Sequence, residues 1–238
     1  MNTLVLLSGG LDSAVLAAHE AQHAPVHPVY VSVGLAWESG ERAILERLLA
    51  APVFAGRVLP LSRVEFTMRD VYSPDHWAIR GEPPAYDTPD EDVYLAGRNL
   101  VLLTKAAMVA TLTGAHRMAL GPLAGNPFPD GRPQFFSAMA TALSLGLDHA
   151  IEIATPFLNW EKPQVIQRGI ELGVPLELTL SCMSPSAGAA GALPLHCGLC
   201  SKCRERRDAF AVARVADPSE YANRSPRESP ARRALGEA

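Results

Sequence analysis

A glycine pair flanked by serines constrains this 238-residue chain more than any other stretch. It reads Ser8-Gly-Gly-Leu-Asp12-Ser13 and directly follows the apolar run that ends at Leu7. A short apolar run, a Ser-Gly-Gly turn and an apolar-periodic segment from Leu11 predict a strand, a tight loop and a helix. The free N–H groups and the positive dipole end of a helix favour an anion at such a junction. The sequence therefore predicts a phosphate-binding loop over residues 8–13.

The residue types in this loop also indicate how it would hold its ligand. Gly9 and Gly10 have no Cβ, so their backbone N–H groups can approach a phosphate closely. Ser8 and Ser13 add hydroxyl donors. Asp12 adds a negative charge that would repel a bare phosphate unless a divalent cation or a rearranging pyrophosphate lies between them. A serine-capped turn that only connects two core elements is the alternative interpretation. The loop has neither the Gly-Lys-Ser/Thr ending of a Walker motif nor a G-x-G-x-x-G pattern.

The rest of the chain alternates between apolar runs and helical periodicity. Strands are predicted over 26–33, 53–60, 116–121 and 151–155, and helices over 40–50, 98–114, 134–146 and 162–173. This alternation predicts an α/β fold with a parallel sheet, whose ligands bind at the carboxyl ends of the strands. The segment 61–95, rich in Pro, Asp and aromatic residues, is predicted to be a functional loop or lid. Residues 213–238 are predicted to be a flexible tail.

All four cysteines of the chain fall within a short C-terminal region. Cys197, Cys200 and Cys203 form two overlapping C-x-x-C steps, and Cys182 lies a loop upstream. Four thiolates in this arrangement are typical of a structural Zn²⁺ site with no open position. Two disulfides, a redox pair and an iron–sulfur cluster are the alternatives.

Composition narrows the choice of ligand and compartment. The formal charge of −4 argues against broad electrostatic binding to nucleic acid, so a small-molecule partner is expected. No apolar run reaches the roughly 18 residues that a membrane helix needs, and no basic segment precedes an apolar one at the N-terminus. We therefore expect a cytoplasmic protein without a membrane partner.

The loop over residues 8–13 resembles the signature of the PP-loop ATP pyrophosphatases, which cleave ATP between the α and β phosphates. Further motifs, in the same order, resemble those of the 7-cyano-7-deazaguanine synthases of queuosine biosynthesis. They are Gly97-Arg98-Asn99, Phe128-Pro-Asp130-Gly-Arg132, Lys162 in Trp-Glu-Lys-Pro, Thr179-Leu-Ser-Cys182, and the cysteine run that ends at Arg206. The resemblance implies an adenine-nucleotide α-hydrolase-like (Rossmann-like) domain over 1–178 and a zinc-binding region over 179–212.

This resemblance also implies an activity and a set of roles. ATP would adenylate 7-carboxy-7-deazaguanine, ammonia would displace AMP to give the amide, and a second ATP would dehydrate the amide to the nitrile. The implied roles are ATP binding by Ser8, Gly9, Gly10, Leu11, Asp12 and Ser13, catalysis by Asp12 with Mg²⁺, Lys162 and Arg98, and contact with the deazapurine by Asn99, Phe128, Asp130 and Arg132. A homodimer is the implied assembly.

Two departures from the synthase pattern keep other activities open. Ala124 stands where the synthases carry an aspartate, and Val33-Gly-Leu-Ala-Trp37 replaces their Tyr-Gly-Gln stretch. One alternative is a divergent adenylating ligase or amide synthase that acts on a related carboxylate or another amine. A tRNA-modifying PP-loop enzyme and an inactive nucleotide-binding scaffold are the others. A tRNA-modifying enzyme of this kind usually needs a catalytic cysteine pair, but the predicted zinc site uses every cysteine of the chain. The intact loop over residues 8–13 argues against an inactive scaffold.

Overall fold

The computed structural model describes residues 2–188 and 192–224. Five parallel strands form one sheet in the order β3-β2-β1-β4-β5. Their bounds are β1 Thr3–Leu6, β2 Val26–Ser32, β3 Ser62–Glu65, β4 Arg117–Ala119 and β5 Glu152–Ala154. The predicted α/β class with a parallel sheet is confirmed. Because the chain runs from β1 to β2 on one side and later adds β4 on the other, the crevice between β1 and β4 is the point where the strand order reverses.

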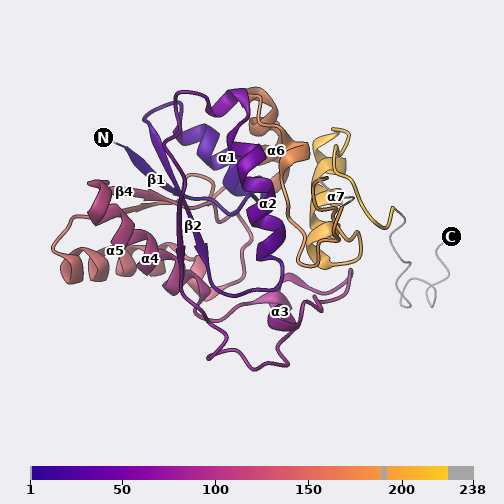
Figure 1. Cartoon of the computed structure of the whole chain (residues 1–238), viewed down its shortest axis with the longest axis horizontal. Coiled ribbons are helices and arrows are strands. Elements are labelled where there is room, and N and C mark those ends of the chain that lie inside the picture. The colour runs from indigo at the N-terminus through magenta and orange to yellow at the C-terminus, as the bar shows by residue number, and fades with distance from the viewer. Residues whose placement is uncertain (1, 189–191, 225–238) are drawn as a thin grey trace.

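Helices cover both faces of this sheet (Figure 1). The helices are α1 Leu11–Glu20, α2 Glu38–Leu49, α3 Trp77–Arg80, α4 Arg98–Thr113, α5 Pro133–Leu147, α6 Lys162–Leu172 and α7 Ser201–Ala213. Helices α4 and α5 pack on one face, α1 and α6 lie together on the other, and α7 packs against α6. Because β1 and β4 are adjacent and parallel, their carboxyl ends lie side by side, and so do the loops that follow them.

Most helix boundaries follow the local sequence signals. Helix α1 begins directly after Gly10, and α4 and α6 begin at the predicted residues. At the start of α6, Glu161 and Gln164 form a reciprocal capping box, and Pro163 occupies the first turn. These caps fix the position of Lys162 at the entrance of its helix.

The predicted strand over 53–60 is wrong. Pro52–Phe54 forms a short 3₁₀ helix, and Gly56 turns the chain with a φ of 70°. Phe54 is buried in the same core cluster as residues of α1 and α2. The run meets the sheet only through Val58, which forms an isolated parallel bridge to Val26. The strand at this edge is β3, whose residues alternate between half-buried and exposed and carry a weak apolar signal.

The C-terminal region contains one helix that the sequence analysis did not predict, α7, followed by a segment that turns back on it. In that segment Tyr221 donates a hydrogen bond to Asp217, and the backbone of Glu220 accepts one from His196. Residues 225–238 of the predicted tail lie outside the described residues. Within the described part of the chain, no helix is both long and apolar enough to cross a membrane.

Candidate active site

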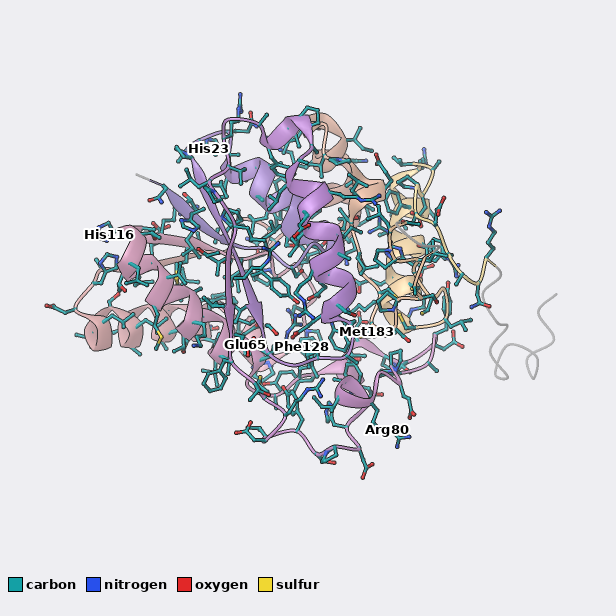
Figure 2. All side chains as sticks on the ribbon, viewed as in Figure 1. His23, Glu65, Arg80, His116, Phe128 and Met183 are labelled. Carbon is teal, nitrogen blue, oxygen red and sulfur yellow. The ribbon has the colours of Figure 1, made fainter. Side chains whose placement is uncertain are left out.

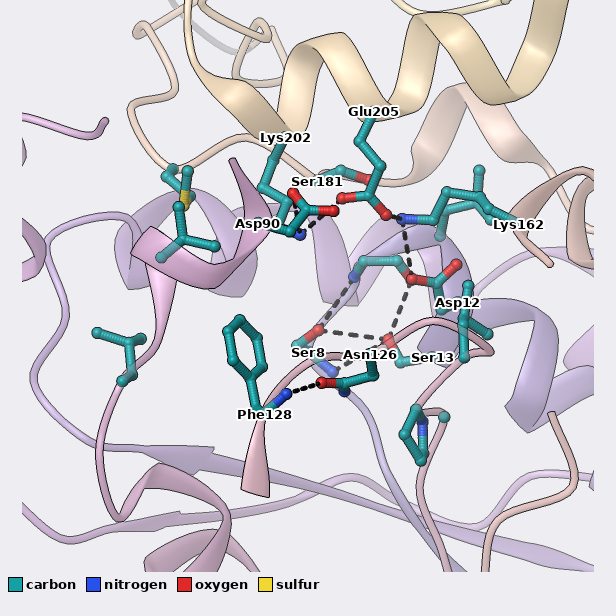
Figure 3. A pocket seen from close by; sticks show the side chains of 18 of the residues that line it. Ser8, Asp12, Ser13, Asp90, Asn126, Phe128, Lys162, Ser181, Lys202 and Glu205 are labelled. Atoms are coloured by element: carbon teal, nitrogen blue, oxygen red, sulfur yellow. Dashed lines mark hydrogen bonds and ion pairs between the residues drawn. The ribbon is translucent and has the colours of Figure 1, made fainter. Parts of the chain in front are cut away.

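A cavity of about 390 Å³ opens at the carboxyl ends of β1 and β4 (Figure 3). The loop Ser8–Ser13 forms one wall, and the segment Gly121–Phe128 after β4 forms another. In Figure 2, Phe128 and Met183 mark the cavity side of the molecule, well apart from His116 at the amino end of β4. A cavity therefore lies at the carboxyl ends of the parallel strands, where the sequence predicts the site.

The loop after β1 is held open by its own hydrogen bonds. Gly9 has a φ of 83°, and a Cβ built there would lie 2.7 Å from Ile44 Cγ2, so only glycine fits without displacement. Ser13 Oγ donates to the Gly10 carbonyl at 3.0 Å and accepts from the Ser8 N–H at 3.3 Å. This conformation presents both serine hydroxyls and the amino end of α1 to the cavity.

Charged side chains of alternating sign line the cavity in a row from the loop after β1 to α7. Lys162 Nζ lies 3.2 Å from Asp12 Oδ2 and also bonds to Glu205. Glu205 in turn accepts from Lys202 at 2.6 Å, and Lys202 Nζ lies 3.8 Å from Asp90. Figure 3 shows this chain of contacts above the two serines.

Burial shapes the protonation of these groups. It raises the pKa of Asp12, against which the charge of Lys162 acts. Burial alone would lower the pKa of Lys162, but Asp12 and Glu205 raise it, so the ammonium form is favoured. For Glu205, burial is outweighed by Lys162 and Lys202, which lower its pKa to about 2. Asp12 nevertheless keeps one buried oxygen, Oδ1, with no hydrogen-bond partner.

Aromatic side chains form the remaining walls. The Phe128 ring stacks on Tyr94 with centroids 5.1 Å apart, and Trp37 stacks on Trp77 at 5.8 Å. Phe128, Trp37 and Trp77 all line the cavity. Flat apolar surfaces next to charged groups are suited to a planar heterocycle that carries an anionic substituent.

The segment predicted to be a lid contributes to this enclosure. Trp77, Asp90, Val93 and Leu95 reach the cavity from it. Asp90 anchors the segment to α7 through Lys202 and Arg204, each 3.8 Å from Asp90 Oδ1. The segment thus lines the cavity and contacts α7.

The structure brings most of the predicted site residues to the cavity. Ser8, Gly10, Leu11, Asp12, Ser13, Arg98, Phe128 and Lys162 line it. Gly9, Asn99, Asp130 and Arg132 do not belong to its lining. The Asn99 side chain donates to the backbone carbonyl of Asp130 at 3.0 Å, which joins the start of α4 to the turn after Phe128. Burial raises the pKa of Asp130, and Arg132 is exposed.

Sequence reasoning missed several lining residues, among them Trp37, Glu41, Asp90, Asn126, Lys202 and Glu205. One usable signal existed for two of them. Lys202 and Glu205 are spaced i, i+3 within the run from Cys200 to Arg206, so a helix there places them on one face and the cysteines on another. Glu41 and Asp90 carried no comparable local signal.

The four cysteines form a separate cluster beside the cavity. All four are unpaired and buried, and their Sγ atoms lie within 4.8 Å of one another. Cys197 Sγ and Cys203 Sγ are 3.8 Å apart, which matches the edge of about 3.8 Å of a tetrahedron with Zn–S bonds of about 2.3 Å. Backbone N–H groups of Ser184 and Cys197 donate to Cys182 Sγ. The cluster is compatible with a zinc site.

The segment before Cys182 contacts the glycine loop after β1 and is itself held by α7. The backbone N–H of Leu180, two residues before Cys182, donates to the Gly9 carbonyl at 2.8 Å. Arg206, fully buried, donates to Thr179 Oγ1 and Ser181 Oγ. The segment that leads to Cys182 therefore contacts the glycine loop and contributes Leu180 and Ser181 to the cavity lining.

Comparison with known proteins adds a family relationship. The sequence matches the family described as "Queuosine biosynthesis protein QueC" over residues 2–214. It is 33% identical to the 7-cyano-7-deazaguanine synthase of Magnetococcus marinus, with 93% of this chain and 97% of that protein covered. The synthase of Anaeromyxobacter dehalogenans is 34% identical over 92% of this chain and 95% of its own length, and that of Methanothrix thermoacetophila is 32% identical over 91% and 96%.

Proposed function

The chain belongs to the QueC family of queuosine biosynthesis proteins, and on this premise we propose how its cavity performs a 7-cyano-7-deazaguanine synthase reaction. It is an ATP-dependent enzyme of that pathway. The proposed sequence is adenylation of 7-carboxy-7-deazaguanine, displacement of AMP by ammonia, and ATP-driven dehydration of the amide to the nitrile. The observation that carries the assignment of chemistry to residues is the Asp12–Lys162 pair beside the glycine loop.

In this proposal the loop Ser8–Ser13 binds the departing pyrophosphate. The Ser8 and Ser13 hydroxyls and the N-terminal N–H groups of α1, which begins at Leu11, are the donors. Gly9 provides the turn, and Gly10 allows close approach of the backbone. Lys162 and Arg98 supply positive charge as the bond between the α and β phosphates breaks.

The charge balance of the cavity supports a requirement for Mg²⁺. Four carboxylates line the cavity (Asp12, Glu41, Asp90 and Glu205) against three cations (Arg98, Lys162 and Lys202). A triphosphate entering the cavity meets the negative charges of Asp12, Asp90 and Glu205, which a divalent cation offsets. Asp12 Oδ1, buried and without a hydrogen-bond partner, is the oxygen that we assign to the metal.

We place the deazapurine ring against Phe128, whose stacking on Tyr94 fixes its orientation. Asn99 and Asp130 act from outside the lining. Their hydrogen bond joins the residue after Arg98 to the turn after Phe128, and so sets the distance between the two side chains that would touch the substrate. Nothing in the structure brings Arg132 to the cavity.

We further propose that the cysteine cluster holds Zn²⁺ and that the enzyme works as a cytoplasmic homodimer. The thiolates provide four soft ligands and no open position, so the ion has a structural role. For the dimer, the support is the resemblance together with large exposed apolar side chains on α4 and α5, Leu112 at 87% and Leu145 at 79%. Sedimentation of the protein and of a Leu112→Glu, Leu145→Glu variant tests the assembly.

The function is tested by mass spectrometry of products after incubation with Mg·ATP, ammonium and 7-carboxy-7-deazaguanine. Nitrile together with AMP and pyrophosphate is the expected result, and Asp12→Asn should abolish all of them. If no AMP forms with this acid, the assignment of substrate is wrong.

A second candidate rests on Ala124, which lines the cavity where the resemblance leads one to expect an aspartate. The loss of this polar contact favours a related carboxylate, or a reaction that ends at the amide. Accumulation of AMP and amide without nitrile, in the same experiment, would select this candidate.

A further inference from the structure

A buried carboxyl next to the phosphate-binding loop has no role in the scheme above. Glu41 lies in the first turn of α2, lines the cavity and is only 8% exposed. Its Oε2 atom accepts a hydrogen bond of 2.9 Å from the Tyr30 hydroxyl. A Cβ built on Gly9 would lie 3.5 Å from the Glu41 carbonyl, so the loop packs directly on this turn. The first turn of α2 therefore packs on the loop where ATP would be cleaved, and Glu41 lines the same cavity.

The surroundings of Glu41 leave it ready to exchange a proton near neutral pH. Burial raises its pKa to about 7, although Arg98, Tyr30 and Trp37 each act to lower it. The charge of Glu38 adds to the increase. A group with such a pKa gains and loses a proton with little free-energy cost at the pH of the cytoplasm, which is the property of an efficient general base.

Neither Glu38 nor Arg98 is bonded to the Glu41 carboxyl. Glu38 is occupied by the backbone N–H groups of Val33, Gly34 and Leu35. Arg98 lines the same cavity but makes no ion pair within the described part of the chain, and its buried Nε atom has no hydrogen-bond partner. Arg98 and Glu41 thus offer a cation and a carboxyl to whatever occupies the space, which suits an acyl oxygen and a nitrogen that bears hydrogen.

The amide-forming step of the proposed function, on which this inference rests, needs a proton acceptor. Ammonia attacks the acyl adenylate with its lone pair, a C–N bond forms, and the C–O bond to AMP breaks with its electron pair leaving on AMP. The nitrogen is left with one proton too many, and a base must take it. Lys162 is held in its ammonium form and Glu205 is bonded to two lysines, so neither is free to do so.

We propose that Glu41 is the general base of the amide-forming step and accepts the proton that the attacking nitrogen loses. Tyr30 is its positioning residue, because its hydroxyl donates to one oxygen of this cavity-lining carboxyl. The adenylation step transfers no proton from nitrogen and does not need this base.

The test separates the two half-reactions in a Glu41→Gln variant. Substrate-dependent exchange of labelled pyrophosphate into ATP reports adenylation, and amide formation at saturating ammonium reports the second step. Glu41→Gln is expected to lower kcat for amide formation by about a hundredfold, the usual contribution of a general base, and to change exchange by less than about threefold. With hydroxylamine, whose adduct gives up its proton more readily than that of ammonia, the loss should shrink to about tenfold or less.

Two further variants make the outcome decisive. Tyr30→Phe removes a hydrogen-bond donor that favours the Glu41 carboxylate, so the acid limb in the pH profile of the amide-formation rate should move to higher pH. In Glu41→Gln this acid limb should disappear. Glu171→Gln makes the same chemical change in a surface pair with Arg168 and is the control for substitution alone. Equal losses with ammonia and hydroxylamine, or an unchanged acid limb in Glu41→Gln, would overturn the proposal. If the wild-type protein shows no exchange with the deazapurine acid, it is the proposed function that fails.

Discussion

Lys162 binds two carboxylates at once: its Nζ atom lies 3.2 Å from Asp12 Oδ2 and also contacts Glu205. The three side chains come from α6, from the start of α1 and from α7, so one ammonium group joins three elements that are far apart in the sequence. Removal of the charge would leave both carboxylates facing each other in a partly buried setting, where uncompensated charge is costly.

The first prediction concerns this ammonium group. Lys162→Met should reduce substrate-dependent pyrophosphate exchange by about a hundredfold or more, because it removes a positive charge aimed at the breaking phosphate bond. Lys105→Met, on the α4 surface near Phe66, is the matched control and should retain exchange. Retention of exchange within about threefold in Lys162→Met would contradict the assignment.

The second prediction concerns the turn at Gly9. Gly9→Ala forces an alanine to a φ of 83° and drives its Cβ against Ile44, so both stability and exchange should fall. Gly56 has a φ of 70° with open space around it, and Gly56→Ala should cost only backbone strain of about 1 kcal/mol. Chemical denaturation and the exchange assay compare the pair, and equal effects would rule out a steric role for the packing on α2.

The third prediction follows from the lowered pKa of Glu205, which is about 2 in the folded protein. A carboxyl with a lowered pKa stabilises the fold fully above its unfolded value of about 4.3, and this contribution is lost as the pH falls toward 2. Between pH 5 and 3 the unfolding free energy of the wild type should fall more steeply than that of Glu205→Gln. The difference should be at most about 3 kcal/mol. Urea denaturation at each pH measures the unfolding free energy. If it falls equally with pH in both proteins, the lysines do not hold the carboxyl.

Glu41 should show the opposite sign. Its pKa of about 7 in the fold is raised, so its contribution to stability is present below about pH 4.3 and is lost as the pH rises through 7. Glu41→Gln should therefore be more stable relative to the wild type at pH 8 than at pH 5. Thermal unfolding at the two pH values measures this difference, and a difference of the reverse sign would place the carboxyl in a different environment.

The last prediction concerns the cysteine cluster. Elemental analysis should find a single zinc ion per chain, and Cys203→Ser should lose it. Because α7 begins directly after Cys200 and carries Lys202 and Glu205 into the cavity, zinc removal by a chelator should abolish pyrophosphate exchange as well as helical signal. Exchange that survives complete removal of zinc would mean that α7 is held without the metal.

The sequence predicts those helices and strands whose signals lie within a few residues. It does not predict those whose conformation depends on contacts with distant parts of the chain. The loop after β1 and the starts of α4 and α6 follow from glycine, capping and apolar periodicity, all read within a few residues. The apolar stretch near Phe54 has the pattern of a strand, because periodicity alone does not tell whether an apolar run pairs with a strand or fills a core. Burial under α1 and α2 decides that question.

The same limit applies to the site. The cavity position of Lys162 and Phe128 was predictable from motif order, whereas Glu41 reaches the cavity only because α2 packs against the loop at Gly9. Asp130, which the motif places among the substrate contacts, lies outside the cavity lining and is hydrogen-bonded to Asn99, 31 residues earlier. Long-range hydrogen bonds of this kind leave no periodic trace in the chain.

The attachment of α7 to both the cysteine cluster and the cavity sets the size of the smallest working fragment. A chain shortened to residue 178 would keep the glycine loop, Asp12 and Lys162, and would lose Glu205, Lys202 and the anchor of Asp90 together. It would also lose Leu180, whose N–H binds the Gly9 carbonyl. On α7, Arg206 donates to the Ser219 hydroxyl, and both the Ser219 N–H and the Tyr221 hydroxyl donate to Asp217. The fragment must therefore extend to about residue 221. Neither half of this protein is a module that can be exchanged by itself.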